Sequence, residues 1–148
     1  MAVSFRNLDV TPDAPVAEWG VEGVLAAVDR GDLSDWSRIA AAVADDPRGE
    51  VADLVLEALD LAEDSGAAAA LRRHLELAVE RADERDRRAV ADELASLWRA
   101  SGLDQATYAH RLGTSRTRFS SYVNGRTVPL ATVLVRARRL AMRSRSGR

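Results

Sequence analysis

An all-α fold is predicted for this chain by three features of its sequence. The apolar residues are 47% of the total and many of them are alanine, whereas aromatic residues are only 5%. Alanine is the strongest helix former and packs helices closely. Apolar residues also recur at the three- and four-residue spacing of a helix, in segments that glycine, proline or capping residues separate. We expect a small N-terminal helical bundle followed by a second helical domain.

The first 15 residues differ from the rest of the chain because no helical period is sustained in them. They contain Pro12 and Pro15. We therefore expect residues 1–15 to form a flexible N-terminal arm.

Four helices are expected in the acidic segment that follows, residues 16–84. The breaks between them are marked by Gly31, Asp45-Asp46-Pro47 and Ser65-Gly66. Each helix carries one apolar face: Val21, Val24, Leu25 and Val28; Trp36, Ile39, Ala40 and Val43; Val51, Leu54, Val55, Ala58 and Leu59; and Leu71, Leu75, Ala78 and Ala82. These faces predict a small bundle, which we expect to mediate dimerisation or to bind an effector or a partner protein.

The charged run from Arg81 to Arg88 leaves two arrangements open. It contains neither glycine nor proline, so the fourth helix could continue into the next domain without a break. A short polar linker is equally compatible with the composition. We favour a linker around residues 83–87, with the second domain beginning at residue 85.

Two short helical patterns lie on either side of Gly113. Asp104 can cap the first helix and Ser115 the second. Gly113 itself allows the positive φ angle of a tight turn. The apolar faces of the two helices are expected to be Ala106, Ala109 and Leu112, and Phe119 and Tyr122. The rest of the second helix is small and polar or basic, which is typical of a helix that packs on one side and contacts nucleic acid on the other.

Three runs of residues carry a resemblance to a known family. They are L-x-Q-A-x-x-A-x-x-L-G at 103–113, S-R-x-x-F-S-x-Y at 115–122 and N-G-R-x-x-P at 124–129. This pattern resembles the helix-turn-helix of the Xre and lambdoid phage repressor (Cro/CI) family, over about residues 88–141. The resemblance implies a lambda-repressor-like DNA-binding domain at residues 85–141. The last helix would end near residue 142, and residues 142–148 would form a basic tail.

The resemblance also implies which side chains contact DNA. Base edges would be read by Arg116, Thr117, Arg118 and Ser121. Phosphates would be contacted by Gln105, Ser115, Asn124 and Arg126. Ser115 would cap its helix with or without DNA. For Asn124 the alternative is that it only forms the turn and contacts no phosphate. Arg116 could pair bidentately with guanine, which is the commonest specific side-chain contact.

The distribution of charge supports contact with nucleic acid independently of the motif. Residues 1–104 hold all 23 acidic residues and 11 arginines, a net charge of −12. Residues 105–148 hold 10 arginines and no acidic residue, a net charge of +10. A tail that only solvated the chain end would not explain why the acid-free segment begins at the first residue of the helix pair. Neutralisation of phosphates and release of counterions would explain it.

Several classes of function are disfavoured by what the sequence lacks. There is no cysteine, and the two histidines have no partners at metal-ligand spacing. No phosphate-binding loop, dinucleotide motif or nucleophile elbow occurs. We therefore expect no enzyme activity, no metal and no cofactor. No apolar run approaches the roughly 18 residues of a membrane span and no signal peptide is evident, so we expect a cytoplasmic protein without membrane contact.

The sequence therefore favours a sequence-specific regulator of transcription that binds double-stranded DNA as a homodimer, most simply as a repressor. The alternative is an antitoxin or phage immunity protein that binds a partner protein through its N-terminal domain and represses its own operon. A third class is a non-specific nucleoid or single-strand binder, which would have equal affinity for unrelated sequences at matched salt.

Overall fold

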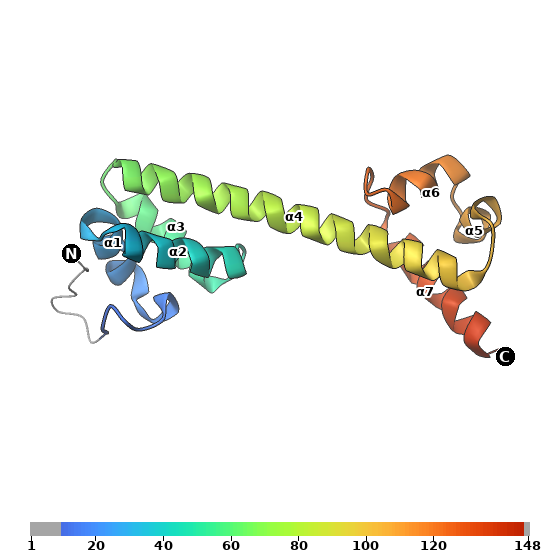
Figure 1. The fold of residues 1–148 in the computed structure, drawn as a ribbon, viewed down its shortest axis with the longest axis horizontal. Coiled ribbons are helices and arrows are strands. Elements are labelled where there is room, and N and C mark those ends of the chain that lie inside the picture. The colour runs from blue at the N-terminus through green and yellow to red at the C-terminus, as the bar shows by residue number, and fades with distance from the viewer. Residues whose placement is uncertain (1–9, 147–148) are drawn as a thin grey trace. The chain divides into compact units, whose positions relative to one another are not determined.

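The computed structural model describes residues 10–146, and within that range it contains helices and no strand. The all-α prediction is therefore confirmed. None of the described helices combines the length and the apolar character needed to cross a lipid bilayer. In chain order the elements are η1 (Val16–Glu18), α1 (Gly20–Arg30), α2 (Leu33–Asp45), α3 (Glu50–Leu61), α4 (Gly66–Ser101), α5 (Gln105–Leu112), α6 (Arg116–Val123) and α7 (Ala131–Ser146) (Figure 1).

The chain divides into two compact units, Met1–Ala82 and Asp83–Arg148, which we call the N-terminal unit and the C-terminal unit. Helix α4 contributes residues to both. The linker expected around residues 83–87 is not present, because α4 is continuous from Gly66 to Ser101.

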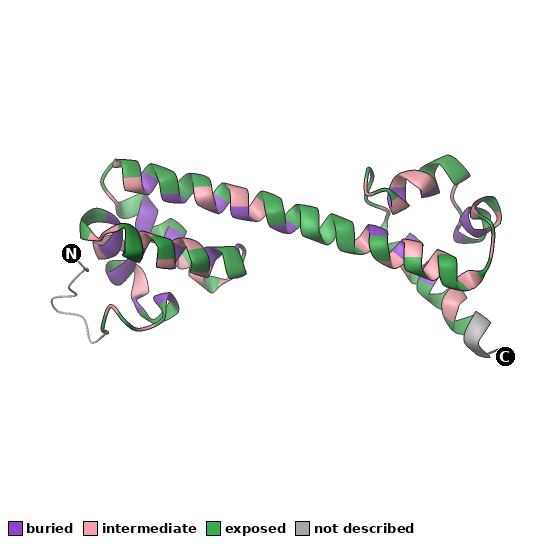
Figure 2. Cartoon of the chain, in the orientation of Figure 1, coloured by how far each residue is buried: buried purple, intermediate pink, exposed green. Residues whose placement is uncertain are grey.

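The physical reason for this continuity lies in the charged middle of α4. Residues 83–89 are all exposed, so no core holds this part of the helix (Figure 2). Glu84 forms ion pairs with Arg87 at 3.0 Å and with Arg88 at 3.9 Å, at helical spacings of three and four residues. Such pairs stabilise a helix that is polar on all sides. Neither glycine nor proline interrupts the run.

The N-terminal unit is built around the apolar faces of its helices. Trp19 precedes α1 and is 2% exposed, so one of the two tryptophans of the unit lies fully in its core. The residues of the expected apolar faces of α1, α2 and α3 are all buried or half-buried, and the first turns of α4 add to the same cluster. Its most completely buried members are Val24, Ala27, Ile39, Ala52, Val55, Ala58 and Leu59.

Part of the predicted N-terminal arm is packed in this unit. Arg38 of α2 donates to the carbonyl oxygens of Pro12 and Asp13, and to that of Ala14 at 2.7 Å. The Arg38 guanidinium also lies 4.9 Å from the ring centroid of Trp19, and Trp19 Nε1 donates to Ala14 O at 2.8 Å. These contacts hold residues 12–14 against the core, so this part of the chain does not form the flexible arm that was predicted. Residues 1–9 of that arm lie outside the described residues.

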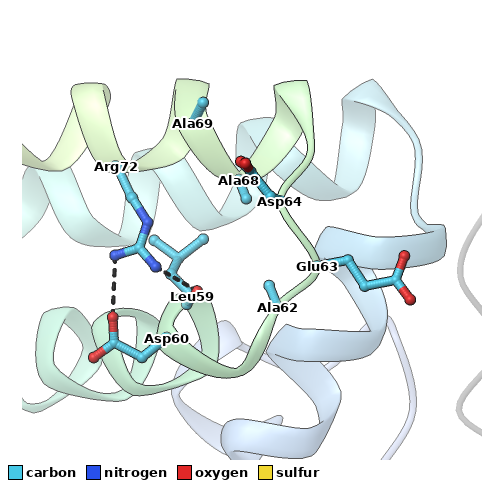
Figure 3. A pocket seen from close by; sticks show the side chains of 8 residues that line it. All are labelled: Leu59, Asp60, Ala62, Glu63, Asp64, Ala68, Ala69 and Arg72. Carbon is cyan, nitrogen blue, oxygen red and sulfur yellow. Dashed lines mark hydrogen bonds and ion pairs between the residues drawn. The ribbon is translucent and has the colours of Figure 1, made fainter.

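An arginine also completes the end of α3. Arg72 of α4 donates from Nη2 to the carbonyl oxygen of Leu59 and from Nη1 to Asp60 Oδ1 at 3.1 Å (Figure 3). Helix α3 is followed by Ala62 in an extended conformation, and not by a glycine in the left-handed conformation. The Leu59 carbonyl would otherwise lack the partner that a left-handed capping residue provides. Glu63 points away from this arginine and toward solvent (Figure 3).

The C-terminal unit is centred on Phe119, which is 0% exposed. Its ring meets those of Trp98 and Tyr108 edge to face, with centroid distances of 5.7 and 5.4 Å. Around these rings pack α4, α5, α6 and α7. The buried cluster consists of Leu94, Tyr108, Ala109, Leu112, Phe119, Tyr122, Val133 and Ala137.

The predicted apolar face of α5 was wrong at one position. Ala106 is exposed, and Tyr108 is buried in its place with 1% exposure. Positions 108, 109 and 112 face inward in place of the predicted 106, 109 and 112, because burial of a tyrosine ring removes far more apolar area from water than burial of an alanine methyl group. Burial raises the pKa of the Tyr108 hydroxyl.

The last helix is longer than expected. The basic tail was predicted to begin at residue 142, but α7 continues to Ser146. No glycine or proline occurs in α7, and Gly147 is the first residue able to interrupt it. Residues 147–148 of the predicted tail lie outside the described residues.

Candidate nucleic-acid interface

The helix pair α5–α6 forms because each helix starts at a side-chain cap. Asp104 accepts from the Thr107 N–H at 3.0 Å and from the Thr107 hydroxyl at 2.7 Å. Both bonds lower the pKa of the Asp104 carboxyl, and the bond from the Thr107 hydroxyl has the larger effect. Ser115 Oγ accepts from the Arg118 N–H at 3.1 Å. Both predicted caps are therefore confirmed.

Gly113 makes the turn between the two helices in a left-handed conformation, with φ 75° and ψ 33°. The N–H groups of Gly113 and Thr114 donate to the carbonyl oxygens of His110 and Ala109, at 2.9 and 3.0 Å. These bonds satisfy the end of α5 in the way that a C-terminal glycine cap does. The predicted role of Gly113 is confirmed.

Helix α7 supports the same turn through Arg136. Its Nη1 donates to the carbonyl oxygen of Leu112, the last residue of α5, at 3.1 Å. A Cβ atom placed on Gly113 would lie 2.9 Å from this Nη1. Glycine at position 113 thus provides both the positive φ angle and the space for the guanidinium. The sequence carries no signal for this contact, because it joins residues 24 positions apart.

The outer face of α6 carries three of the four residues predicted to read bases. Arg116, Thr117 and Arg118 are exposed in the first turn, whereas Phe119 and Tyr122 are buried at 0% and 6% exposure. The fourth residue, Ser121, is half-buried one turn later. The helix is therefore held by one aromatic side and presents a basic, polar first turn to solvent.

Gln105 is positioned beside this turn. Its Oε1 accepts from Arg116 Nε at 3.3 Å, so the first residue of α5 contacts the first residue of α6. This bond uses the Nε–H group of Arg116 and does not involve its two terminal guanidinium nitrogens. The sequence had suggested a phosphate contact for Gln105, and the geometry adds an orienting contact to Arg116.

The end of α6 is closed by the Asn124-Gly125 pair. Asn124 donates from Nδ2 to the carbonyl oxygen of Ser120 at 2.8 Å, so its side chain is used within the turn. Gly125 has φ 69°, and the following Arg126 N–H donates to Ser121 O at 3.0 Å. Gly125 therefore takes the predicted left-handed conformation. The geometry supports the turn-forming reading of Asn124, while the Arg126 side chain is exposed beyond it.

The C-terminal unit carries an excess of positive charge. Residues 83–148 contain 14 arginines and six acidic residues, a net charge of +8. One acidic side chain, Glu93, is paired bidentately with Arg138 of α7 at 2.6 and 3.0 Å. The hydrogen bond from Arg138 lowers the pKa of Glu93. Arg139 and Arg143 of α7 are exposed.

Comparison with known proteins does not identify a relative. No protein-family model, curated protein or solved structure matches the chain. The case for a function therefore depends on the chemistry of the helix pair. The structure brings Gln105 against Arg116 and gathers Arg116, Thr117 and Arg118 on one exposed turn, with Ser121, Ser115, Asn124 and Arg126 along the same short segment.

Proposed function

We propose that the C-terminal unit binds double-stranded DNA with α6 in the major groove, and that the chain acts as a dimeric regulator of transcription, most simply a repressor. The observation that carries this proposal is the asymmetry of α6. Its aromatic residues are buried, and its exposed first turn carries two arginines within a segment that has no acidic residue. A helix of this kind fits the major groove in width and in charge.

The roles of the side chains follow from their positions. Arg116, oriented by Gln105, would donate two hydrogen bonds to the O6 and N7 atoms of a guanine. Thr117 and Arg118 would contact neighbouring bases or phosphates. The capped start of α5 would lie near the backbone, where its N–H groups favour a phosphate. Arg126 would add a phosphate contact after the second helix.

A dimer is expected on energetic grounds. A single helix-turn-helix module contacts only a few base pairs, which gives too little discrimination against the many competing sites in a genome. Two copies that bind a palindrome overcome this limit, and two-fold symmetry is the commonest form of assembly. We assign the self-association to the N-terminal unit, which does not contain the proposed DNA-binding helix.

Selection from a pool of random duplexes with the full-length protein tests the proposal. We expect enrichment of an inverted repeat whose half-sites lie about 10 base pairs apart, one helical turn. Binding affinities for the selected site and for a scrambled duplex of equal length are then compared at one salt concentration. Enrichment of no sequence would overturn the proposal of specific binding and favour a non-specific binder.

The base contact is tested with Arg116→Ala and with Arg30→Ala as a matched control. Both changes remove one exposed arginine, but Arg30 lies in the last turn of α1 in the N-terminal unit. We expect Arg116→Ala to weaken binding to the selected site by about 5- to 150-fold, with a small effect on the scrambled duplex. Arg30→Ala should change neither affinity. Equal losses on both duplexes would reassign Arg116 to a phosphate contact.

A second candidate function is that of an antitoxin or immunity protein, which would bind a partner protein through the N-terminal unit. The observation that favours it is a pair of exposed leucines on α3, Leu56 at 40% and Leu61 at 64% exposure, beside the exposed Asp53, Glu57 and Asp60. Large apolar side chains left exposed next to charged residues are a feature of protein contacts. Co-expression with the protein encoded by the adjacent gene, followed by a mass measurement of the purified complex, distinguishes this function from that of a stand-alone regulator.

A further inference from the structure

A pocket of about 390 Å³ lies within the N-terminal unit, between α2 and the first turns of α4. Its volume is in the range of small-molecule sites. The pocket exists because α4 begins with the run Gly66–Ala70, whose glycine and alanines have no side chains long enough to fill the space beside Trp36. Leu33, at its edge, is 73% exposed. A large apolar side chain left this exposed beside an apolar hollow is a feature of binding sites.

The polar side chains in the lining use their own protons within the unit and offer hydrogen-bond acceptors to a ligand. Ser37 donates its hydroxyl proton to the Leu33 carbonyl at 2.7 Å, which leaves the lone pairs of Oγ. His74 Nε2 lies 3.0 Å from the Ala40 carbonyl, which accepts only, so Nε2 donates this bond, and in the tautomer with the proton on Nε2 the lone pair is on Nδ1. Trp36 uses its indole N–H on the Ala27 carbonyl at 2.9 Å.

The charge of the unit selects further among ligands. Residues 1–82 hold 17 acidic residues and seven arginines, a net charge of −10. A field of this sign attracts cations and disfavours carboxylates. The ligand that suits the pocket therefore has an apolar body, at least one hydrogen-bond donor and a positive charge.

We propose that this pocket binds a small hydrophobic amine. The apolar body would lie between the Trp36 ring and the alanines at the start of α4. The ammonium group would donate to Ser37 Oγ and His74 Nδ1. The inference is independent of the proposed DNA binding, because every residue it uses belongs to the N-terminal unit and its test requires no DNA.

Titration of the ¹⁵N-labelled full chain with 2-phenylethylamine tests the site, with 2-phenylethanol and 3-phenylpropionate as comparison ligands. We expect saturable shifts confined to the backbone amides of residues 33–40 and 66–74 and to the Trp36 indole N–H. The amine should bind about tenfold more tightly than the alcohol, because a charge-assisted hydrogen bond is stronger than a neutral one. The carboxylate should bind more weakly than both. Equal binding of the amine and the carboxylate would overturn the proposal.

Two matched variants separate the pocket from the acidic surface. Ala70→Leu fills the pocket with a residue that favours helix, whereas Ala69→Leu makes the same change at an exposed neighbour outside its lining. We expect Ala70→Leu to abolish the confined shifts and Ala69→Leu to retain them. Ser37→Ala should narrow the preference for the amine over the alcohol. Shifts that spread over the acidic residues and persist in Ala70→Leu would show counterion binding and overturn the site.

Discussion

Replacing Phe119 with alanine should unfold the C-terminal unit and leave the N-terminal unit folded. The Phe119 side chain is 0% exposed and its ring meets those of Trp98 and Tyr108 at 5.7 and 5.4 Å. Truncation of a buried phenylalanine to alanine destabilises by about 3–5 kcal/mol. The two edge-to-face contacts place this case at the upper end of that range. A domain of this length has a total stability of only about 3–10 kcal/mol, so the loss is comparable with the whole.

The three tryptophans allow each unit to be followed separately. Trp19 and Trp36 lie in the N-terminal unit and Trp98 in the C-terminal unit, and each donates its indole N–H to a backbone carbonyl. In a ¹H–¹⁵N spectrum of Phe119→Ala, the Trp98 indole signal should collapse to the position of unfolded chain, while the other two keep theirs. Phe119→Leu keeps most of the apolar volume and should leave the unit folded at a loss of about 1–2 kcal/mol. An unshifted Trp98 signal in the alanine variant would refute the reasoning.

Three further predictions concern the contacts that position the helix pair. Asp104→Ala should lower the melting temperature of the C-terminal unit by several degrees in calorimetry. Because the hydrogen bonds from Thr107 lower the pKa of Asp104 below its ordinary 3.8, this stabilisation is complete at neutral pH and is lost as the pH falls through the folded value. Variant and parent should therefore converge in strong acid, whereas equal melting temperatures at neutral pH would show that the cap does not stabilise the unit. Arg138→Ala should return the pKa of Glu93 toward its ordinary 4.5 in an NMR titration, and an unchanged value would contradict the ion pair. Arg136→Ala should accelerate amide exchange in α5 and weaken DNA affinity without changing base preference, whereas Arg136→Lys should recover part of the protection. Equal exchange in all three proteins would show that the bond to Leu112 does not support the turn.

Much of the helix pair could be predicted because its signals are local. Asp104 and Ser115 lie immediately before the helices that they cap, and the bond from each side chain reaches only three residues along the chain. Gly113 and Gly125 take the positive φ angles that glycine adopts without a steric penalty. The all-α class followed from the same kind of local pattern.

The features that could not be predicted depend on contacts between distant residues or on competition between similar ones. Ala106 and Tyr108 both fitted an inward face of α5, and only the aromatic cluster around Phe119 decides between them. The contact of Arg136 with the end of α5 has no sequence signal, because a basic residue on an exposed helix normally predicts solvation.

The continuous helix α4 has a consequence for how the protein can be divided for experiment. Any cut between residues 82 and 89 passes through hydrogen-bonded turns and leaves up to four carbonyl groups and four amide groups unpaired at the new ends. A fragment that retains the whole 36-residue helix α4 has no such cut end, whereas the complementary fragment lacks its own part of α4. Cleavage by trypsin should be slow in this stretch for the same reason. Arg85, Arg87 and Arg88 are exposed but helical, so the helix must unwind locally before the peptide bond can enter the active site of the protease.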